Sequence, residues 1–281
     1  MGGFEMKLTV LAENTAVSSK FLSEHGLSIH VQTSSDCILF DMGASNQIEQ
    51  NATSCNINLS TVSYAVLSHG HYDHGGGLLT FFNKNQSAPI FVHKGAFEPH
   101  YSRRTSGIAF IGLPKHLLNH SQIKIISDDN ITFISENLSV FSDAKSNILC
   151  PTSNQKLLIQ TDDGYKPDPF EHEQYGVVNE HGKLLLYTGC AHRGIVNILS
   201  RFCELYGRAP DVVIGGFHLE DPRNPLSFDE SLCRKTAKAL SRFHSTQYLT
   251  GHCTGSFPYK ILQESLHDQI KPLSAGKVFF I

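Results

Sequence analysis

The chain has 281 residues, of which 40% are hydrophobic and 17% are charged. That size allows one large domain or two small ones, and the composition excludes a mainly disordered chain. The formal net charge of −3 gives no general attraction to nucleic acid or to an anionic membrane, so we expect neither as a partner.

Short apolar runs alternate with longer helical patterns along the chain. The runs, bounded by turn residues, predict strands at 8–11, 28–32, 37–40, 62–67, 89–93, 123–126, 131–135, 138–141, 156–161, 183–187, 212–214, 247–249 and 277–281. Apolar residues at helical spacing predict helices at 77–82, 195–206, 231–243 and 259–266. Turn residues between the three strands of 123–141 predict that these strands form one meander.

The order of these elements indicates the fold class. Strands come in two batches with helices interspersed, which predicts an α/β protein built as a four-layer αβ/βα sandwich of two mixed β-sheets flanked by helices. Segment 94–120 is hard to assign, because Pro99 and Pro114 interrupt it and it carries Arg103 and Arg104. We expect a lid or a substrate-facing insertion there.

The cysteines and the apolar runs indicate the compartment. Seven cysteines, with no Cys-x-x-Cys pair, argue against a disulfide framework and favour a reducing environment. The first residues lack the basic segment and apolar core of a signal peptide, and no apolar run approaches the ~20 residues of a transmembrane helix. We therefore expect a cytoplasmic protein.

The stretch from Ser68 to Gly77 reads Ser-His-Gly-His-Tyr-Asp-His-Gly-Gly-Gly and directly follows the apolar run 65–67. Imidazoles and a carboxylate this crowded predict divalent metal binding, because a metal ion takes up their lone pairs. In a tight loop one metal faces two of these residues and a second metal faces the other two. The first pair is His69 and His71, and the second is Asp73 and His74. A solvated histidine-rich loop would need neither the strand before it nor the glycines after it.

Potential ligands also follow four other predicted strands. They are Asp41 after 38–40, Cys190 and His192 after 184–187, His218 after 212–214, and His252 after 248–249. If these strand ends meet at one edge of the sandwich, their loops surround a single site. We expect His192 and His252 to bind metal and Asp41 to orient a ligand histidine, whereas a core histidine and a plain turn are the alternatives.

Other residues have less specific patterns. The Cys190 thiolate would bind metal, although a buried free cysteine is common, and His218 would contact either metal or substrate. Glu24 and His25 are expected near the site, but a helix end capped by Gly26 explains them almost as well. The possible clamps for an anionic substrate are Lys94, Arg103, Arg104 and Arg193, with ordinary solvated side chains as the alternative.

These motifs, with Leu-Phe-Asp-Met-Gly at 39–43, resemble the metallo-β-lactamase superfamily. The resemblance spans nearly the whole chain, so it implies a single domain over 1–281 with a site for one or two metal ions at the edge of the sheets. The stretches 24–28, 188–197, 215–219 and 252–255 are similar to one branch of it. That branch contains a methanopterin-pathway synthase, which acts on a pterin diphosphate, and predicted metal-dependent hydrolases. Two-zinc members usually have a further histidine and, at a strand end, an aspartate. This chain has Cys190 in place of that aspartate, and His172 is a candidate counterpart of the histidine.

Three functions follow from this resemblance. The first is a hydrolase that uses a metal-activated water on an ester or phosphoester of a small, anionic substrate, with Asp73 and His218 as catalytic residues. One ion would be held by His69, His71 and either His192 or His252, and the remaining histidine would join the second ion. Zinc suits the imidazoles, and iron or manganese also occupies such sites. The second is a transferase of the synthase type, and the third is a metal-dependent sensor without catalysis.

Overall fold

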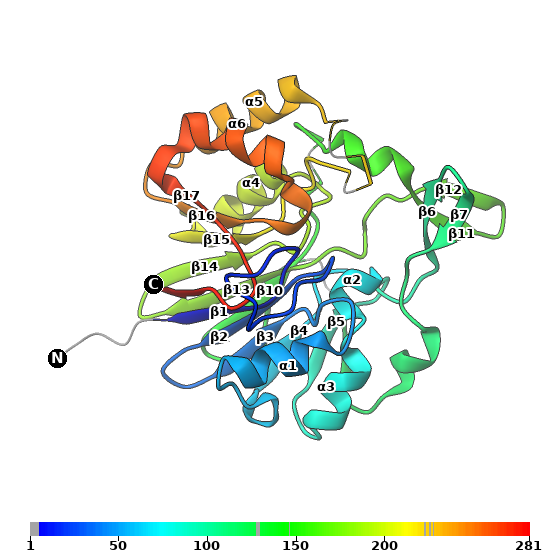
Figure 1. Cartoon of the computed structure of the whole chain (residues 1–281), viewed down its shortest axis with the longest axis vertical. Coiled ribbons are helices and arrows are strands. Elements are labelled where there is room, and N and C mark those ends of the chain that lie inside the picture. Colours follow the sequence, from blue (N-terminus) through cyan, green and yellow to red (C-terminus); the bar gives the residue numbers. More distant parts are fainter. Residues whose placement is uncertain (1–5, 128–129, 146, 222, 225, 227) are drawn as a thin grey trace.

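The computed structural model describes residues 6–127, 130–145, 147–221, 223–224, 226 and 228–281. Within these residues two mixed sheets pack face to face, and helices cover the outer face of each (Figure 1). This confirms the predicted four-layer αβ/βα sandwich. Among the described residues, no helix has the length and apolar character needed to cross a membrane.

The first sheet has the strand order β18-β1-β2-β3-β4-β5-β8. Its strands are β1 (Lys7–Ala12), β2 (Ser28–Gln32), β3 (Cys37–Phe40), β4 (Tyr64–Val66), β5 (Ile90–His93), β8 (Ile123–Ile126) and β18 (Val278–Phe280). The pairs from β3 to β8 are parallel, so β3, β4 and β5 end at the same edge. Helices α1 (Gln47–Ser54) and α3 (Leu78–Lys84) cover the outer face.

The second sheet has the strand order β17-β16-β15-β14-β13-β10-β9. Its strands are β9 (Thr132–Phe133), β10 (Leu138–Phe141), β13 (Tyr175–Glu180), β14 (Lys183–Tyr187), β15 (Val212–Gly215), β16 (Gln247–Thr250) and β17 (Ile270–Pro272). Strands β14 to β17 are parallel, and their outer face is covered by α4 (Ile195–Tyr206), α5 (Glu230–Leu240) and α6 (Ser256–Leu266). Helix α4 buries its predicted apolar stripe and ends at Gly207, whose φ of 71° favours glycine.

The core between the two sheets lies directly beneath the strand ends. Phe40 of β3 stacks on Tyr187 of β14 with ring centroids 4.6 Å apart, and both side chains are fully buried. Around them pack apolar residues of both sheets, including Ile29, Val178 and Ile214. This packing fixes β3 and β14 relative to each other, so the loops that follow them start from a rigid base.

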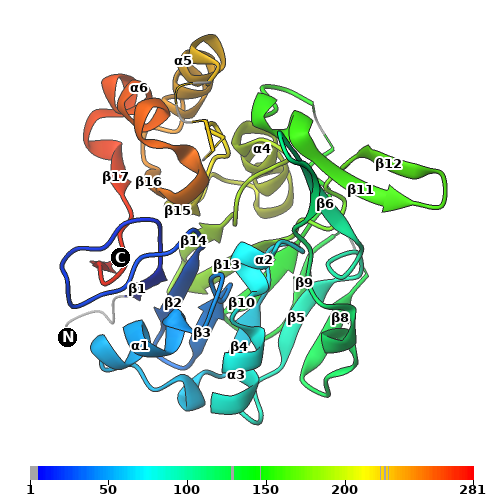
Figure 2. The ribbon, with the colours of Figure 1, turned by 45° about the vertical axis from the view of Figure 1, so that its right-hand side comes forward.

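A third, smaller sheet lies beside the sandwich (Figure 2). Its strands, in the order β12-β11-β6-β7, are β6 (His100–Arg104), β7 (Gly107–Phe110), β11 (Leu157–Thr161) and β12 (Gly164–Pro167). Segment 94–120 therefore supplies a hairpin that pairs with a second hairpin about 55 residues later. Its role as a lid remains a prediction.

The predicted meander over 123–141 is wrong, because β8 pairs with β5 in the first sheet, whereas β9 and β10 belong to the second. The sequence patterns also did not predict α1, β6, β7, β12, β13 or β17. Helix α1 is mostly polar, so its few apolar residues form no clear helical pattern in the sequence. Strand β17 is short and contains Pro272. Short helical turns, also not predicted, complete the chain: α2 (Tyr72–Gly75), η1 (Leu59–Thr61), η2 (Lys115–Asn119), η3 (Thr152–Lys156), η4 (His252–Thr254) and η5 (His267–Gln269).

Candidate metal centre

The loops after β3, β4, β14, β15 and β16 meet at one edge of the sandwich. Parallel pairing brings the ends of β3 and β4 together in one sheet and the ends of β14, β15 and β16 together in the other. Residues nearly 180 positions apart in sequence, such as His74 and His252, therefore come within 3.3 Å of each other. The two sheets contribute to one site.

One group of possible ligands consists of His69, His71 and His192, whose donor atoms lie within 4.8 Å of one another. All three are buried, and the Nε2 atom of each has no hydrogen-bond partner among the described residues. A buried nitrogen without a partner is costly, and three of them together fit a divalent cation that would take up their lone pairs.

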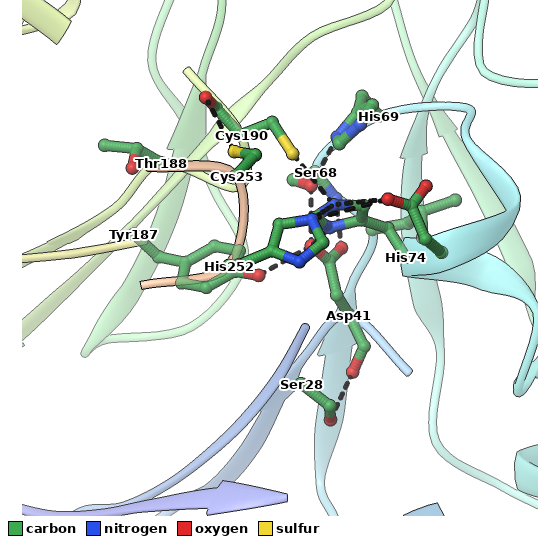
Figure 3. Close-up of polar contacts among 12 residues, drawn as sticks. Ser28, Asp41, Ser68, His69, His74, Tyr187, Thr188, Cys190, His252 and Cys253 are labelled. Atoms are coloured by element: carbon green, nitrogen blue, oxygen red, sulfur yellow. Dashed lines mark hydrogen bonds and ion pairs between the residues drawn. The ribbon is translucent and has the colours of Figure 1, made fainter. Parts of the chain in front are cut away.

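A second group lies beside the first and consists of Asp73, His74 and His252. Figure 3 labels His74 and His252 of this group. The Oδ2 atom of Asp73 lies 3.3 Å from Nε2 of His252 and 3.9 Å from Nε2 of His74, and the two Nε2 atoms are 3.3 Å apart. The sequence left open which of His192 and His252 joins which pair. The structure places His192 with His69 and His71, and His252 with Asp73 and His74.

Cys190 lies between the two groups. Its Sγ atom is 3.0 Å from Nε2 of His74, and its donor atom also groups with those of His69, His192 and His252. A thiol in that position could bridge two ions. Cys253 lies next to it and donates to the carbonyl oxygen of Cys190 over 3.6 Å.

Asp41 is fully buried and orients His74 and the Ser68 hydroxyl beside His69. Its carboxylate accepts hydrogen bonds from the Ser68 backbone and hydroxyl, from Nδ1 of His74 and from the Tyr187 hydroxyl. Because Nδ1 of His74 donates to Asp41, its Nε2 keeps a lone pair. The Ser68 hydroxyl gives its hydrogen to Asp41, so Nδ1 of His69 must donate to Ser68 over 2.9 Å, which leaves Nε2 of His69 free as well.

Two asparagines orient His192 and His252 in the same way. Asn154 donates its amide to the His192 carbonyl at 2.7 Å, so its oxygen accepts from Nδ1 of His192 at 3.0 Å. Asn14 donates its amide to the His252 carbonyl at 3.3 Å, and its oxygen accepts from Nδ1 of His252 at 2.9 Å. Each asparagine therefore fixes the tautomer that presents Nε2. Neither asparagine was identified from the sequence, and no motif or spacing marks them.

The electrostatics of the first group favour neutral imidazoles. Burial lowers the pKa of His69, His71 and His192 well below the ordinary value, and the neighbouring histidines lower it further. In the second group burial would lower the pKa of His252, but Cys253 and Asp73 outweigh it and raise that pKa to about 9. Burial would likewise raise the pKa of Asp73, yet His74, His252 and His25 hold it well below its usual range.

A further buried group supports the loop that carries His69 and His71. Nδ1 of His172 accepts from the Gly70 backbone at 3.0 Å, and Asp168 lies 2.8 Å from Nδ1 of His100 and 3.3 Å from Nε2 of His172. Burial would raise the pKa of Asp168, but His172 and His100 more than offset this and lower it. His172, the candidate counterpart of the further superfamily histidine, thus holds the loop through Gly70. His100 and Asp168 were not identified from the sequence.

Glu173 fixes the loop that carries His192. Its carboxylate accepts from the backbone of His192 at 2.6 Å, the backbone of Arg193 at 3.0 Å and the Tyr175 hydroxyl at 2.7 Å. Burial raises its pKa to about 7, although these hydrogen bonds act in the opposite direction. The sequence analysis assigned no role to Glu173.

The two ligand groups open into a cavity of about 610 Å³, which suits a small-molecule ligand. Of the remaining predicted residues, those that line it are Glu24, His25, Arg104, Cys190 and His218. His25 lies 3.3 Å from Asp73, and Glu24 accepts hydrogen bonds from Ala44 and Ser45. Lys94, Arg103 and Arg193 do not line this cavity, and Arg193 donates instead to the carbonyls of Ala144 and Pro169.

Comparisons with known proteins agree with this architecture. The family model of the metallo-β-lactamase superfamily matches residues 24–204. The 7,8-dihydropterin-6-methyl-4-(β-D-ribofuranosyl)-aminobenzene-5'-phosphate synthase of Methanocaldococcus jannaschii is 29% identical, and the match covers 97% of this chain and 96% of the synthase.

Solved structures show the same fold over nearly the whole chain. Tm1679, described as a metal-dependent hydrolase of the β-lactamase superfamily, has a TM-score of 0.83 and 29% identity, covering 98% of this chain and 99% of Tm1679. Zn²⁺-bound PqqB of Methylobacterium extorquens shares the fold alone, with a TM-score of 0.58, 12% identity and coverage of 98% and 100%. The relatives with a stated activity are enzymes, as expected for this chain. Since the family model covers more than half of the sequence, the chain belongs to the metallo-β-lactamase superfamily.

Proposed function

We propose that the protein is a metal-dependent hydrolase that cleaves an ester or phosphoester bond of a small, anionic molecule. The observation that carries this proposal is the pair of adjacent ligand groups whose Nε2 atoms are buried and oriented toward each other beside a cavity. Divalent ions held there, most simply zinc, would polarise the substrate and acidify a water molecule near neutral pH.

Two side chains that line the cavity have the chemistry to move protons. Asp73 is ionised, because its pKa is held low by the histidines around it, so it can accept a proton from the attacking water. Nδ1 of His218 is buried and has no hydrogen-bond partner among the described residues. His218 also lines the cavity, its ring lies 4.2 Å from that of His192, and we assign it the contact with the leaving group.

The experiment that tests the metal centre is elemental analysis of purified protein beside hydrolysis assays on phosphoesters. We expect close to two ions per chain in the wild type and fewer in His71→Ala and Asp73→Ala, with loss of activity in both. His181→Ala is the matched control, since His181 is exposed and lies outside the cavity. Full activity in both ligand variants, or a folded protein that takes up no metal, would refute the proposal.

A transferase reaction is the second candidate, and the similarity to the Methanocaldococcus jannaschii synthase favours it. The same ions would then bind a diphosphate leaving group, a natural task for cations with oxygen ligands. Pyrophosphate release from a pterin diphosphate, without turnover of simple phosphoesters, identifies the transferase. Incorporation of ¹⁸O from water into a product identifies the hydrolase.

A further inference from the structure

Two arginines line the same cavity from different parts of the fold. Arg104 and Ser102 lie on one face of β6, because side chains two positions apart point the same way along a strand. Arg223 comes from the segment after β15, and its guanidinium donates to the Ser102 hydroxyl at 3.0 Å. The hydrogen bond links this segment to the small third sheet, so both arginines have a defined position at the cavity.

The ion pairs around Arg223 contain more cations than carboxylates. Asp221 accepts from both Arg223 and Lys156, at 3.2 Å and 2.6 Å, so one carboxylate faces two cations. Within the described residues, the Arg104 side chain forms neither a hydrogen bond nor an ion pair. Of the other carboxylates that line the cavity, Glu24 is occupied by Ala44 and Ser45, and Asp73 belongs to the second ligand group.

Tyr72 adds an uncharged donor beside the arginines. It stands between His71 and Asp73 in the chain, lines the cavity and is 39% exposed, so its hydroxyl is accessible to a ligand. Arg104 and Arg223 line the same cavity, so all three side chains can reach one ligand.

We propose that Arg104, Arg223 and Tyr72 form an anion subsite that binds a phosphate group of the substrate distinct from the group that reacts at the metal ions. The Arg104 guanidinium, the N–H groups of Arg223 that Asp221 and Ser102 do not use, and the Tyr72 hydroxyl together offer enough donors for the three oxygens of a phosphate monoester. The proposal rests on the hydrolase or transferase function above and narrows its substrates to phosphorylated small molecules with a second reactive group.

The test compares binding of methylphosphonate with binding of alkane bisphosphonates of increasing length, by calorimetry on metal-loaded protein. The wild type should bind one of the bisphosphonates at least about tenfold more tightly than the monophosphonate, because only the longer ligand reaches both subsites. Arg104→Gln and Arg223→Gln should each lose most of that gain while keeping their metal content. Arg103→Gln is the matched control and should keep the gain, since this neighbour does not line the cavity.

Other outcomes separate this proposal from the metal chemistry. If no bisphosphonate gains affinity in the wild type, or if both arginine variants keep the gain, the anion subsite is refuted and the metal centre stands. If the protein holds no metal but phosphonate binding still depends on Arg104, the subsite stands and the proposed catalytic function fails. Arg104→Gln removes no side-chain hydrogen bond or ion pair among the described residues, so we expect this variant to fold.

Discussion

A histidine can bind a metal through only one ring nitrogen at a time, and the partner of the other nitrogen decides which one is used. In this protein the partner differs from one histidine to the next: a carboxylate for His74, a serine hydroxyl for His69, and an asparagine amide for His192 and His252. In each case the hydrogen bond involves Nδ1 and leaves Nε2 for a ligand. The centre is thus ordered by its neighbours before any ion binds.

The two ligand groups should respond differently to pH. The pKa of His252 is about 9 without metal, so His252 carries a proton at neutral pH, whereas the lowered pKa values of His69, His71 and His192 leave them neutral. We expect zinc uptake by the second group to displace about one proton from His252 at pH 7–8. The affinity of that group for zinc should therefore rise with pH and level off above about pH 9.

Zinc titration in a weak buffer with a pH indicator measures this proton release, and His252→Ala should release about one proton fewer. In the metal-free protein, a rise in pH has the opposite effect and lowers the stability of the fold. Because the folded pKa of His252 lies above 6.5, its protonation stabilises the fold fully below pH 6.5, and the contribution is lost as pH rises through about 9. Proton release that is unchanged in His252→Ala would contradict the assignment.

The sequence marks His69, His71, Asp73 and His74 as candidate ligands by their residue types and spacing within one motif, and their role as ligands stays a prediction. It could not predict Asn14, Asn154 or Arg223. An asparagine or arginine is common on any surface, and the hydrogen bonds of these three arise only because the fold brings distant segments together. Their roles depend on tertiary position, which no local pattern records.

At the scale of elements, the loop between β4 and α2 is tightly confined. A Cβ atom on Gly70 would lie 2.1 Å from the carbonyl oxygen of Ala96, a backbone atom that cannot move aside easily. The backbone of Gly70 also donates to His172. The loop that carries His69 and His71 therefore depends on close approach to the segment before β6.

Gly70→Ala should displace this loop and lower the metal content, with a loss of stability of about 2 kcal/mol or more from overpacking. Gly182→Ala is the control: Gly182 has a φ of 84° but open space around its Cβ position, so the change should cost about 1 kcal/mol and leave metal binding intact. Elemental analysis and urea unfolding of both variants measure the two effects. Wild-type metal content in Gly70→Ala would refute the steric argument.

The elements themselves were predicted where apolar periodicity is strong, as in β3, β15 and α4. The meander over 123–141 was predicted wrongly because turn residues show that the chain bends but not which sheet receives the next strand. Strand pairing in the third sheet joins hairpins far apart in sequence, and such long-range pairing has no local signature.

At the scale of the whole molecule, each ligand group draws residues from both halves of the sandwich. His69 and His71 follow the first sheet and His192 follows the second, while His74 and His252 are divided in the same way. An ion in either group would link the two sheets. Metal binding should therefore stabilise the entire fold rather than one loop.

Removal of metal with a chelator should lower the free energy of unfolding by about 4 kcal/mol, relative to protein with free zinc at a thousandfold excess over its dissociation constant. This corresponds to a fall in melting temperature on the order of 10 °C. Differential scanning calorimetry with and without chelator measures the effect, and Asp73→Ala should show a smaller change. A melting temperature independent of zinc would mean that no ion links the two sheets.

The two ligand groups also differ in composition, since one contains imidazoles alone and the other adds the carboxylate of Asp73. Imidazole suits zinc, whereas carboxylate oxygen also suits manganese and iron. When several metals are present together, we therefore expect the protein to bind a different element in each group. The activity measured after loading with a single metal would then be lower than the activity of the heterobimetallic protein. Reconstitution with two metals in a defined order would measure this difference.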